Sequence, residues 1–379
     1  MLEGYGVGRQ PLPTLPTIPN AGPEKGKSMA MTSMTTRGGR RRLLARTVLV
    51  AGATAAGLVL AGCSSGGSGS NASASGASEG AVNIAAFVAD QSNPLDTAVA
   101  AALQDEAAKQ GATITIFDGK NDPNGQANAC QSAVGTGRYD ALIIKPVSGP
   151  TMMPCARNAL AAGDKVIALD TALGPEDVAA IQVPGISASI VSLAKTNGQG
   201  LVTLTQRACQ GVDPCNVLYL YGPPSFKFVA DTRQAFLDGI ASDASVKIVA
   251  DQTNNWDTNQ AGSDAKQLLQ AHPEVSVITM DCDQCAIAVQ SALAASGQGA
   301  GVKIISAGSS GPGVDAIKAG KIFGSTVLLP RTIAKEAVDD AIKAVRGETI
   351  DQTELEAVSL STVGPVVTQD NVDQFTAEW

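Results

Sequence analysis

Short apolar runs alternate with segments of helical spacing along the chain from residue 81 onward. The first series of apolar runs predicts strands at residues 82–88, 113–117, 141–144 and 165–169. The rhythm starts again further along, with predicted strands at residues 216–220, 246–249, 275–279 and 302–305. Apolar strands joined by helices are typical of parallel sheets that are buried on both faces. The pattern therefore predicts an α/β protein with two doubly wound, Rossmann-like lobes.

The residues before this pattern have the order of an export signal. A basic block, RGGRRR at 37–42, precedes an uncharged run at 48–62, which is short for a hydrocarbon core of about 30 Å. Residues 1–62 are therefore expected to be a leader and signal peptide. The exit LAGC at 60–63 resembles the bacterial lipobox, and this resemblance implies that Cys63 is lipidated. The alternatives are a plain secretory signal and, from the adjacent arginines, a twin-arginine signal.

Composition and net charge differ between the residues before and after position 62. Residues 63–80 are rich in Gly, Ser and Ala, and we expect a flexible tether there. Residues 1–62 carry eight of the 27 Lys and Arg and two of the 35 Asp and Glu, which leaves a net charge of −14 on residues 63–379. A domain this acidic is repelled by phosphate backbones, so we expect no nucleic-acid partner.

The sequence offers little support for an enzyme. His272 is the single histidine, which excludes a multi-His metal site and leaves one imidazole for any Ser-His-Asp triad. No G-x-G-x-x-G follows the first predicted strand, G-x-x-x-x-G-K-[ST] does not occur, and no G-x-S-x-G stands between a predicted strand and helix. We therefore expect no catalytic residues, no cofactor and no metal.

Several stretches, taken in order, resemble one family. They are residues 82–94, which end in Asn93-Pro94, DALII at 140–144, KVIALD at 165–170, Trp256-Asp257, HPEV at 272–275, and Asp283 with Cys285-Ala286. Their order and spacing over residues 81–330 are similar to the ribose-type periplasmic binding proteins, with a longer C-terminal tail. Members from Gram-positive bacteria are lipoproteins, which agrees with the lipobox.

The resemblance implies two lobes with a ligand in the cleft between them and three chain crossings at the hinge. We expect the crossings near residues 183–185, 307–309 and 329–331. The first lobe is then residues 81–184 with 308–330, and the second is residues 185–307 with 331–379. Ligands of such sheets meet the carboxyl ends of the strands, which gives the cleft its physical reason.

Candidate ligand-binding residues are those that follow the predicted strands. They are Asp90, Asn93, Leu95, Asp96, Asp170, Phe226, Arg233, Asn255, Trp256, Asp283 and Ser309. Asn93 and Asp170 match the family's sugar-binding Asn and Asp, and Trp256 matches a stacking aromatic. Carboxylates and amides bind vicinal hydroxyls, and an aromatic ring covers an apolar sugar face. The alternatives are helix caps for Asn93 and the aspartates, and a core or hinge position for Trp256.

Departures from the family pattern argue against ribose itself. Leu95 and Asp96 stand where the resemblance implies aromatics, and Thr171 stands in place of an Arg. Cys282, Gly308 and Leu328 replace polar residues of the family. The cleft is instead expected to collect Asp90, Asp96, Asp170, Asp281 and Asp283 with few cations, which leaves a polyol, another sugar or a cationic ligand open.

Seven cysteines divide into Cys63 for the lipid and six in the exported part. An even number in an exported domain favours disulfides, and six cysteines allow fifteen pairings. Locality favours Cys209 with Cys215. Cys130 and Cys155 lie near the starts of successive helices, and Cys282 and Cys285 remain. The C-x-x-C spacing of the last pair leaves a metal or redox role as the alternative.

The leading functional prediction is the substrate-binding lipoprotein of an ABC importer. It would be a monomer, exported and anchored by its lipid to the outer face of the cell membrane. It would capture a small solute, most simply a sugar or polyol, by lobe closure and deliver it to a membrane permease. The alternatives are a ligand-sensing receptor lipoprotein of a signalling system and a binder of a cationic or other non-sugar molecule.

Overall fold

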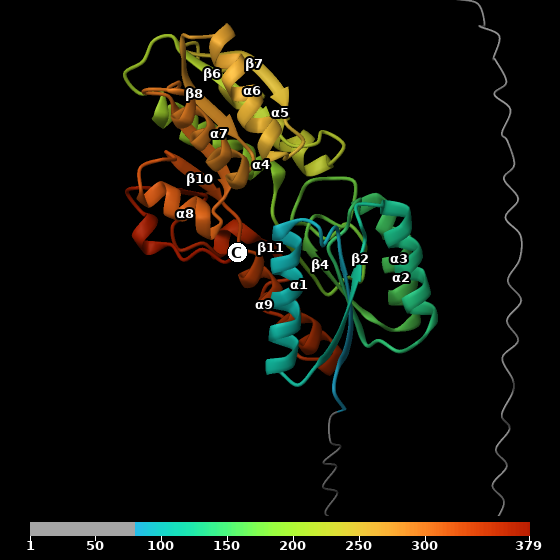
Figure 1. Ribbon diagram of the computed structural model, residues 1–379. Helices are drawn as coiled ribbons and strands as arrows, with labels where there is room; N and C mark the ends of the chain where they lie inside the picture. Colours follow the sequence, from blue (N-terminus) through green and yellow to red (C-terminus); the bar gives the residue numbers. More distant parts are fainter. Residues whose placement is uncertain (1–79) are drawn as a thin grey trace, which may run out of the picture. The chain divides into compact units, whose positions relative to one another are not determined.

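The computed structural model describes residues 80–379. The predicted signal peptide, the lipobox with Cys63 and nearly all of the predicted tether lie outside the described residues. Within the described part, no helix is long and apolar enough to cross a membrane. The described residues contain two α/β lobes, each built around its own six-stranded sheet, which confirms the predicted fold class (Figure 1).

The first sheet has the strand order β11-β5-β4-β3-β1-β2, and all its pairs are parallel. Its strands are β1 (Asn83–Val88), β2 (Thr113–Asp118), β3 (Ala141–Ile144), β4 (Lys165–Asp170), β5 (Ala188–Val191) and β11 (Glu354–Glu356). Its helices are α1 (Pro94–Lys109), α2 (Pro123–Gly135), α3 (Gly149–Ala162) and α9 (Pro330–Arg346).

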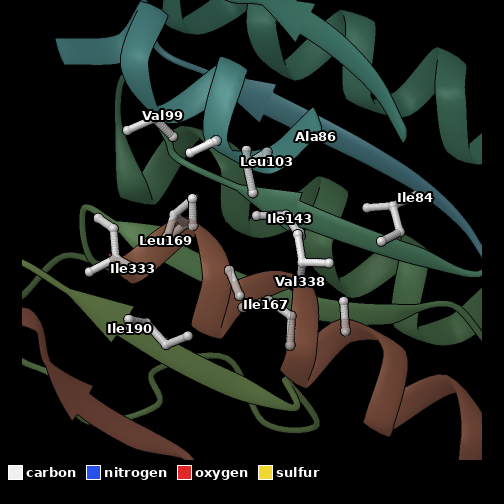
Figure 2. Close-up of a cluster of buried hydrophobic side chains, with 14 of the residues drawn as sticks. Ile84, Ala86, Val99, Leu103, Ile143, Ile167, Leu169, Ile190, Ile333 and Val338 are labelled. Atoms are coloured by element: carbon white, nitrogen blue, oxygen red, sulfur yellow. The ribbon is translucent and has the colours of Figure 1, made fainter. Parts of the chain in front are cut away.

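Helices cover both faces of this sheet, which explains its nearly unbroken apolar strands. α1 and α9 pack on one face, and α2 and α3 pack on the other. Figure 2 shows the first of these cores, in which Ile333 and Val338 of α9 lie against Ile167 and Leu169 of β4. α9 is therefore part of the first lobe, although it follows five strands of the second sheet in sequence.

The second sheet has the order β12-β10-β9-β8-β6-β7, with β12 antiparallel to β10 and the other pairs parallel. Its strands are β6 (Cys215–Tyr221), β7 (Val246–Thr253), β8 (Val275–Met280), β9 (Lys303–Gly308), β10 (Gly324–Val327) and β12 (Val366–Thr368). Its helices are α4 (Ala194–Ala208), α5 (Lys227–Ile240), α6 (Thr258–Ala271), α7 (Asp283–Ser296) and α8 (Gly311–Lys318). Two short 3-10 helices, η1 (Ala357–Leu360) and η2 (Val372–Gln374), lie in the last segment.

The lobe boundaries expected from the sequence are wrong in three places. β5 pairs with β4, so residues 185–191 extend the first lobe. β9 pairs with β10 in the second sheet, so residues 308–327 belong to the second lobe and the chain does not cross at 307–309. α9 and β11 belong to the first lobe, so residues 331–356 are not part of the second. The apolar pattern places no strand at 188–191, and this puts the first crossing one element too early.

The chain crosses between the lobes at three segments. They are residues 192–193 between β5 and α4, 328–329 between β10 and α9, and 357–365 between β11 and β12. The crossing expected near 329–331 lies at the second of these. A small cavity of about 20 Å³ is lined by all three segments, through Leu193, Leu329 and Ala357 among others. The crossings therefore lie together, as a hinge requires.

Candidate functional site

The candidate site lies at the carboxyl ends of the strands. In each sheet the direction in which the chain adds successive strands reverses between two neighbouring strands. In the first sheet the chain winds outward on either side of the β1–β3 pair, and in the second on either side of the β6–β8 pair. Helices leave the sheet on opposite faces at such a switch point, and the crevice between their N-termini receives ligands in open α/β sheets. The candidate site therefore consists of polar residues that directly follow strands. In the first lobe these follow β1, β3 and β4, and in the second lobe they follow β6, β7 and β8.

Three buried charges form a cluster at the switch point of the first lobe. Lys145 follows β3, and its Nζ lies 2.8 Å from Asp96 Oδ1 and 2.7 Å from Asp170 Oδ2. The exposed fractions of Asp96, Lys145 and Asp170 are only 4%, 7% and 8%. Asp170 also accepts a 2.7 Å hydrogen bond from Ser192 Oγ, which brings the first hinge segment into contact with the cluster.

The electrostatics of this cluster favour a charged lysine. Burial lowers the pKa of Lys145, but the two carboxylates outweigh burial and raise its pKa above the ordinary value. Burial raises the pKa of Asp96, while Lys145 opposes that shift. An ammonium group shared between two carboxylates is the arrangement in which buried charges are tolerated.

The expected acidic cleft of this lobe contains one buried cation, Lys145, that the sequence analysis does not name. Lys145 lies between Asp96 and Asp170 and offsets one of their two negative charges, which a count of the aspartates alone does not include. The signal was present, since Lys145 stands directly after the apolar strand ALII and before Pro146. A charged residue at that point must lie at the carboxyl edge of the sheet.

The other first-lobe candidates shape the turn between β1 and α1. Asp90 Oδ1 accepts hydrogen bonds from Ser92 N at 2.9 Å and from Ser92 Oγ at 2.7 Å. Asn93 caps α1, because its Oδ1 accepts from Leu95 N at 2.8 Å, and Pro94 follows at the first helical position. The capping role considered for Asn93 is therefore present, and Asn93 stays partly exposed beside the buried charges.

The second lobe places an aromatic and carboxylate cluster at its own switch point. Asp281, directly after β8, accepts hydrogen bonds from Gly222 N at 2.9 Å and from Trp256 Nε1 at 3.1 Å. The ring of Phe226 lies 5.4 Å from that of Trp256, centroid to centroid. Gly222 is required here, because a Cβ at that position would lie 2.3 Å from the Trp256 ring. The indole thus packs against Gly222 at the end of β6 and donates a hydrogen bond to the Asp281 carboxylate.

Four sequence candidates of the second lobe have other partners. Asp283 is fully buried and accepts from Ser306 Oγ at 2.6 Å, Ser325 Oγ at 2.8 Å and Ser310 N at 2.6 Å. Ser309 is fully buried, and its backbone N–H donates to Ser325 Oγ at 3.0 Å. Arg233 pairs with Asp251 and lies over the Tyr221 ring, and Asn255 is exposed in the turn before Trp256. The structure does not bring these four side chains into the cluster around Asp281.

Comparison with known proteins decides the family. A family model described as a periplasmic binding protein domain matches residues 84–349. The chain belongs to this family. Its membership confirms the resemblance found in the sequence and implies an exported, solute-binding protein.

Relatives of this periplasmic binding protein carry sugar and polyol names. The ribose import binding protein of Bacillus subtilis is 22% identical over 274 residues, which cover 71% of this chain and 84% of that protein. The xylitol-binding protein of Mycolicibacterium smegmatis is 25% identical over 262 residues, covering 67% of this chain and 68% of that protein. An ABC transporter solute binding protein from Bacillus halodurans, solved with bound myo-inositol, has a TM-score of 0.66 at 18% identity. The match covers 79% of this chain and 98% of that structure, and it agrees with the two-lobed fold described above.

Six cysteines of this periplasmic binding protein form three disulfides. The pairs are Cys130–Cys155, Cys209–Cys215 and Cys282–Cys285. The second pair is the one that locality favours, and it is confirmed. The first joins α2 to α3 on the outer face of the first sheet, and the second closes the turn before β6. Among residues 80–379, no group of three or more His, Cys, Asp or Glu side chains could hold a metal ion.

Asp281 gives the site a pH dependence that can be measured. Burial raises its pKa to about 6, against the opposing hydrogen bonds from Gly222 and Trp256. Because the folded pKa is above the unfolded value of about 3.9, its contribution to stability is full below about pH 4 and is lost as the pH rises through about 6. Over this window wild type should lose up to about 3 kcal/mol of unfolding free energy relative to Asp281→Asn.

Urea unfolding of wild type and Asp281→Asn at pH values from 4 to 7 measures this difference. The variant lacks the carboxylate at every pH, which changes its stability by a constant amount. The titration of Asp281 is therefore reported by how the difference in unfolding free energy between the two proteins changes with pH. Other buried carboxyls titrate in both proteins and cancel in the subtraction. A difference that stays constant across the range would show that Asp281 keeps an ordinary pKa.

Proposed function

We propose that this protein is the solute-binding lipoprotein of an ABC importer and that its solute is an uncharged polyol or sugar. The observation that carries the proposal is the pair of clusters at the two switch points, one on each lobe. One offers carboxylate oxygens around Lys145, and the other offers the Trp256 ring with Asp281. Hydroxyl groups donate to carboxylates, and the apolar face of a sugar or cyclitol packs on an indole.

Charge pairing supports an uncharged solute over a cationic one. Asp96 and Asp170 share the charge of Lys145, and Asp283 takes its hydrogen bonds from serines. A polyamine would therefore meet few unpaired carboxylates at these ends of the strands. The relatives named for ribose and xylitol, and the solved relative with bound myo-inositol, support the same class.

The delivery route rests on the sequence and on the family. The lipobox at 60–63 supports anchoring through Cys63, and the export signal supports a place outside the cell membrane. Closure of the lobes on the solute would create the surface that a permease recognises, because contacts from both lobes favour the closed arrangement. A sensor of a signalling system would close in the same way, and only its membrane partner would differ.

A thermal-shift panel tests the solute class. Xylitol, myo-inositol, D-ribose, D-allose and spermidine are added in turn to the full chain. A ligand that binds only the native state raises the free energy of unfolding by about 2.7 kcal/mol at a hundredfold excess over Kd. We expect a clear rise in Tm with at least one uncharged solute, and its loss in Trp256→Ala. Tyr139→Ala is the matched control, since Tyr139 precedes β3 at the opposite edge of the sheet. A rise with spermidine alone, or with none of the five, would contradict the proposed class.

Loss of Cys63 tests the anchor separately. In Cys63→Ala the diacylglyceryl acceptor is gone, so the protein should leave the membrane fraction for the medium or the periplasm. Cell fractionation followed by immunoblotting measures the distribution, with Cys209→Ala as the control cysteine change. Retention of Cys63→Ala on the membrane would overturn the lipoprotein proposal and leave the solute proposal untouched.

A further inference from the structure

The last five residues of the sequence link the two lobes outside the hinge. They lie beyond residues 84–349, which match the family model. Phe375 is buried in the core of the second lobe beside α7 and α8, and Ala377 packs against the same core. From there the chain reaches the start of α9, which belongs to the first lobe. Figure 1 shows the chain end, marked C, near α8 and α9.

Glu378 is bound to the start of α9. Its Oε2 accepts from Arg331 N at 2.8 Å and from Thr332 N at 3.0 Å, and its Oε1 contacts Thr332 Oγ1. The guanidinium Nε of Arg331 donates in turn to the Glu378 carbonyl at 2.7 Å. A carboxylate that accepts the first free N–H groups of a helix is stabilised by those bonds and by the helix dipole. Glu378 thus works as the N-terminal cap that α9 lacks from its own Leu329.

Trp379 is bound to the carboxyl edge of the second sheet. Its Nε1 donates to the Gly308 carbonyl at 2.9 Å, and its own carbonyl accepts from Gly311 N at 2.7 Å. The ring covers Gly308 so closely that a Cβ there would lie 2.8 Å from Cζ2 of Trp379. Gly308 also has a φ of +125°, which side chains rarely allow. Both the close Trp379 ring and the backbone conformation therefore require glycine at this position.

The position of this ring relates it to the solute site. Gly308 ends β9, β9 pairs with β8, and Asp281 directly follows β8. Trp379 and Trp256 are the two tryptophans of the sequence, and each covers a strand end of the same sheet edge. Trp379 as a whole residue remains partly exposed.

We propose that Trp379 is a further wall of the solute site and that Glu378 positions it from the first lobe. This inference rests on the proposed function, because the wall needs a solute at the carboxyl ends of the strands. Since Glu378 holds the start of α9 while Trp379 holds β9 and α8, a change in the arrangement of the lobes moves the two contacts together. Trp379 is then a specificity-determining residue, and Glu378 is a positioning residue.

Fluorine NMR tests the positioning without any solute. The full chain labelled with 5-fluorotryptophan gives one resonance for each of its two tryptophans, and Trp379→Phe assigns them. Glu378→Ala should shift the Trp379 resonance and raise its exposure to solvent, while Trp256 stays in place. Glu336→Ala removes a carboxylate from the same helix and is the control, with no shift expected. An unmoved Trp379 resonance in Glu378→Ala would overturn the positioning role.

Addition of solute tests the wall. With saturating xylitol or myo-inositol, the resonances of Trp256 and Trp379 should both shift with one apparent Kd. Trp379→Ala should weaken that Kd by about tenfold, and Trp379→Phe should restore most of it, as for a lost aromatic contact. A shift of Trp256 alone would overturn the wall and leave the proposed function standing. If neither resonance moves with any solute of the panel, the proposed solute class fails and the wall fails with it.

Discussion

Replacement of Lys145 by methionine is expected to lower the free energy of unfolding by about 3–5 kcal/mol. The change removes the only cation within the buried first-lobe cluster and leaves Asp96 and Asp170 facing each other without it. Loss of one partner from a buried ion pair costs this much because an uncompensated charge stays in a medium of low polarity. Urea unfolding at pH 7, followed by circular dichroism, measures the loss.

The control is a lysine whose ion pair is exposed. Lys335 lies 2.5 Å from Asp339 on α9, and its side chain is 54% exposed. Lys335→Met should cost less than about 1 kcal/mol, because water screens the pair. Adding Asp96→Asn and Asp170→Asn to Lys145→Met should recover much of the loss, since no bare charge then remains. Equal losses for the two lysine variants, or no recovery, would contradict a charged cluster.

The three disulfides are expected to stabilise the protein in the order of the loops that they close. A cross-link lowers the entropy of the unfolded chain, and by this relation Cys130–Cys155, with a separation of 25, contributes about 3.5 kcal/mol. Cys209–Cys215, with a separation of 6, contributes about 2 kcal/mol, and Cys282–Cys285, with a separation of 3, about 1.6 kcal/mol. Paired Cys→Ala variants of each bridge, unfolded in urea side by side, measure the order.

Burial of the replaced side chains does not explain the expected order by itself. Cys130, Cys155 and Cys215 are fully buried and Cys209 is 6% exposed, so alanine leaves comparable small voids at the first two bridges, while Cys282 of the third bridge is only partly buried. The length of the closed loop therefore separates the first two pairs. If Cys282→Ala/Cys285→Ala proved the most damaging pair, the loop-entropy account would be wrong, and a local role at the start of α7 would replace it.

The sequence predicted the sheets well because their strands carry a strong signal. The apolar runs at 141–144 and 165–169 are buried on both faces, as expected for strands of a parallel sheet that helices cover on both sides. The run at 188–191, ASIV, is short and contains a serine, so its place in the first sheet became visible only through its pairing with β4. The positions of the hinge crossings depend on such strand pairings, and a pairing between distant segments cannot be deduced from the local sequence pattern.

The candidate site was predictable in place and less so in detail. The rule of strand ends located Asn93, Asp96, Asp170 and Trp256 at the carboxyl edges. It could not show which aspartates already have partners, because Lys145, Ser192 and Ser306 come from other strands and turns. Trp379 could not be found at all by this rule, since it reaches the edge of the sheet from the far end of the sequence. Long-range contacts of this kind need the folded chain.

Small-angle X-ray scattering of the full chain, titrated with myo-inositol or xylitol, measures whether the two lobes close on a solute. If a polyol or sugar is held between the two clusters by closure of the lobes, the radius of gyration should fall and saturate at the Kd that calorimetry gives for the same solute. Calorimetric binding with scattering that does not change at saturation would contradict capture by closure. Absence of both heat and compaction with every uncharged solute of the panel would contradict the solute-binding account itself.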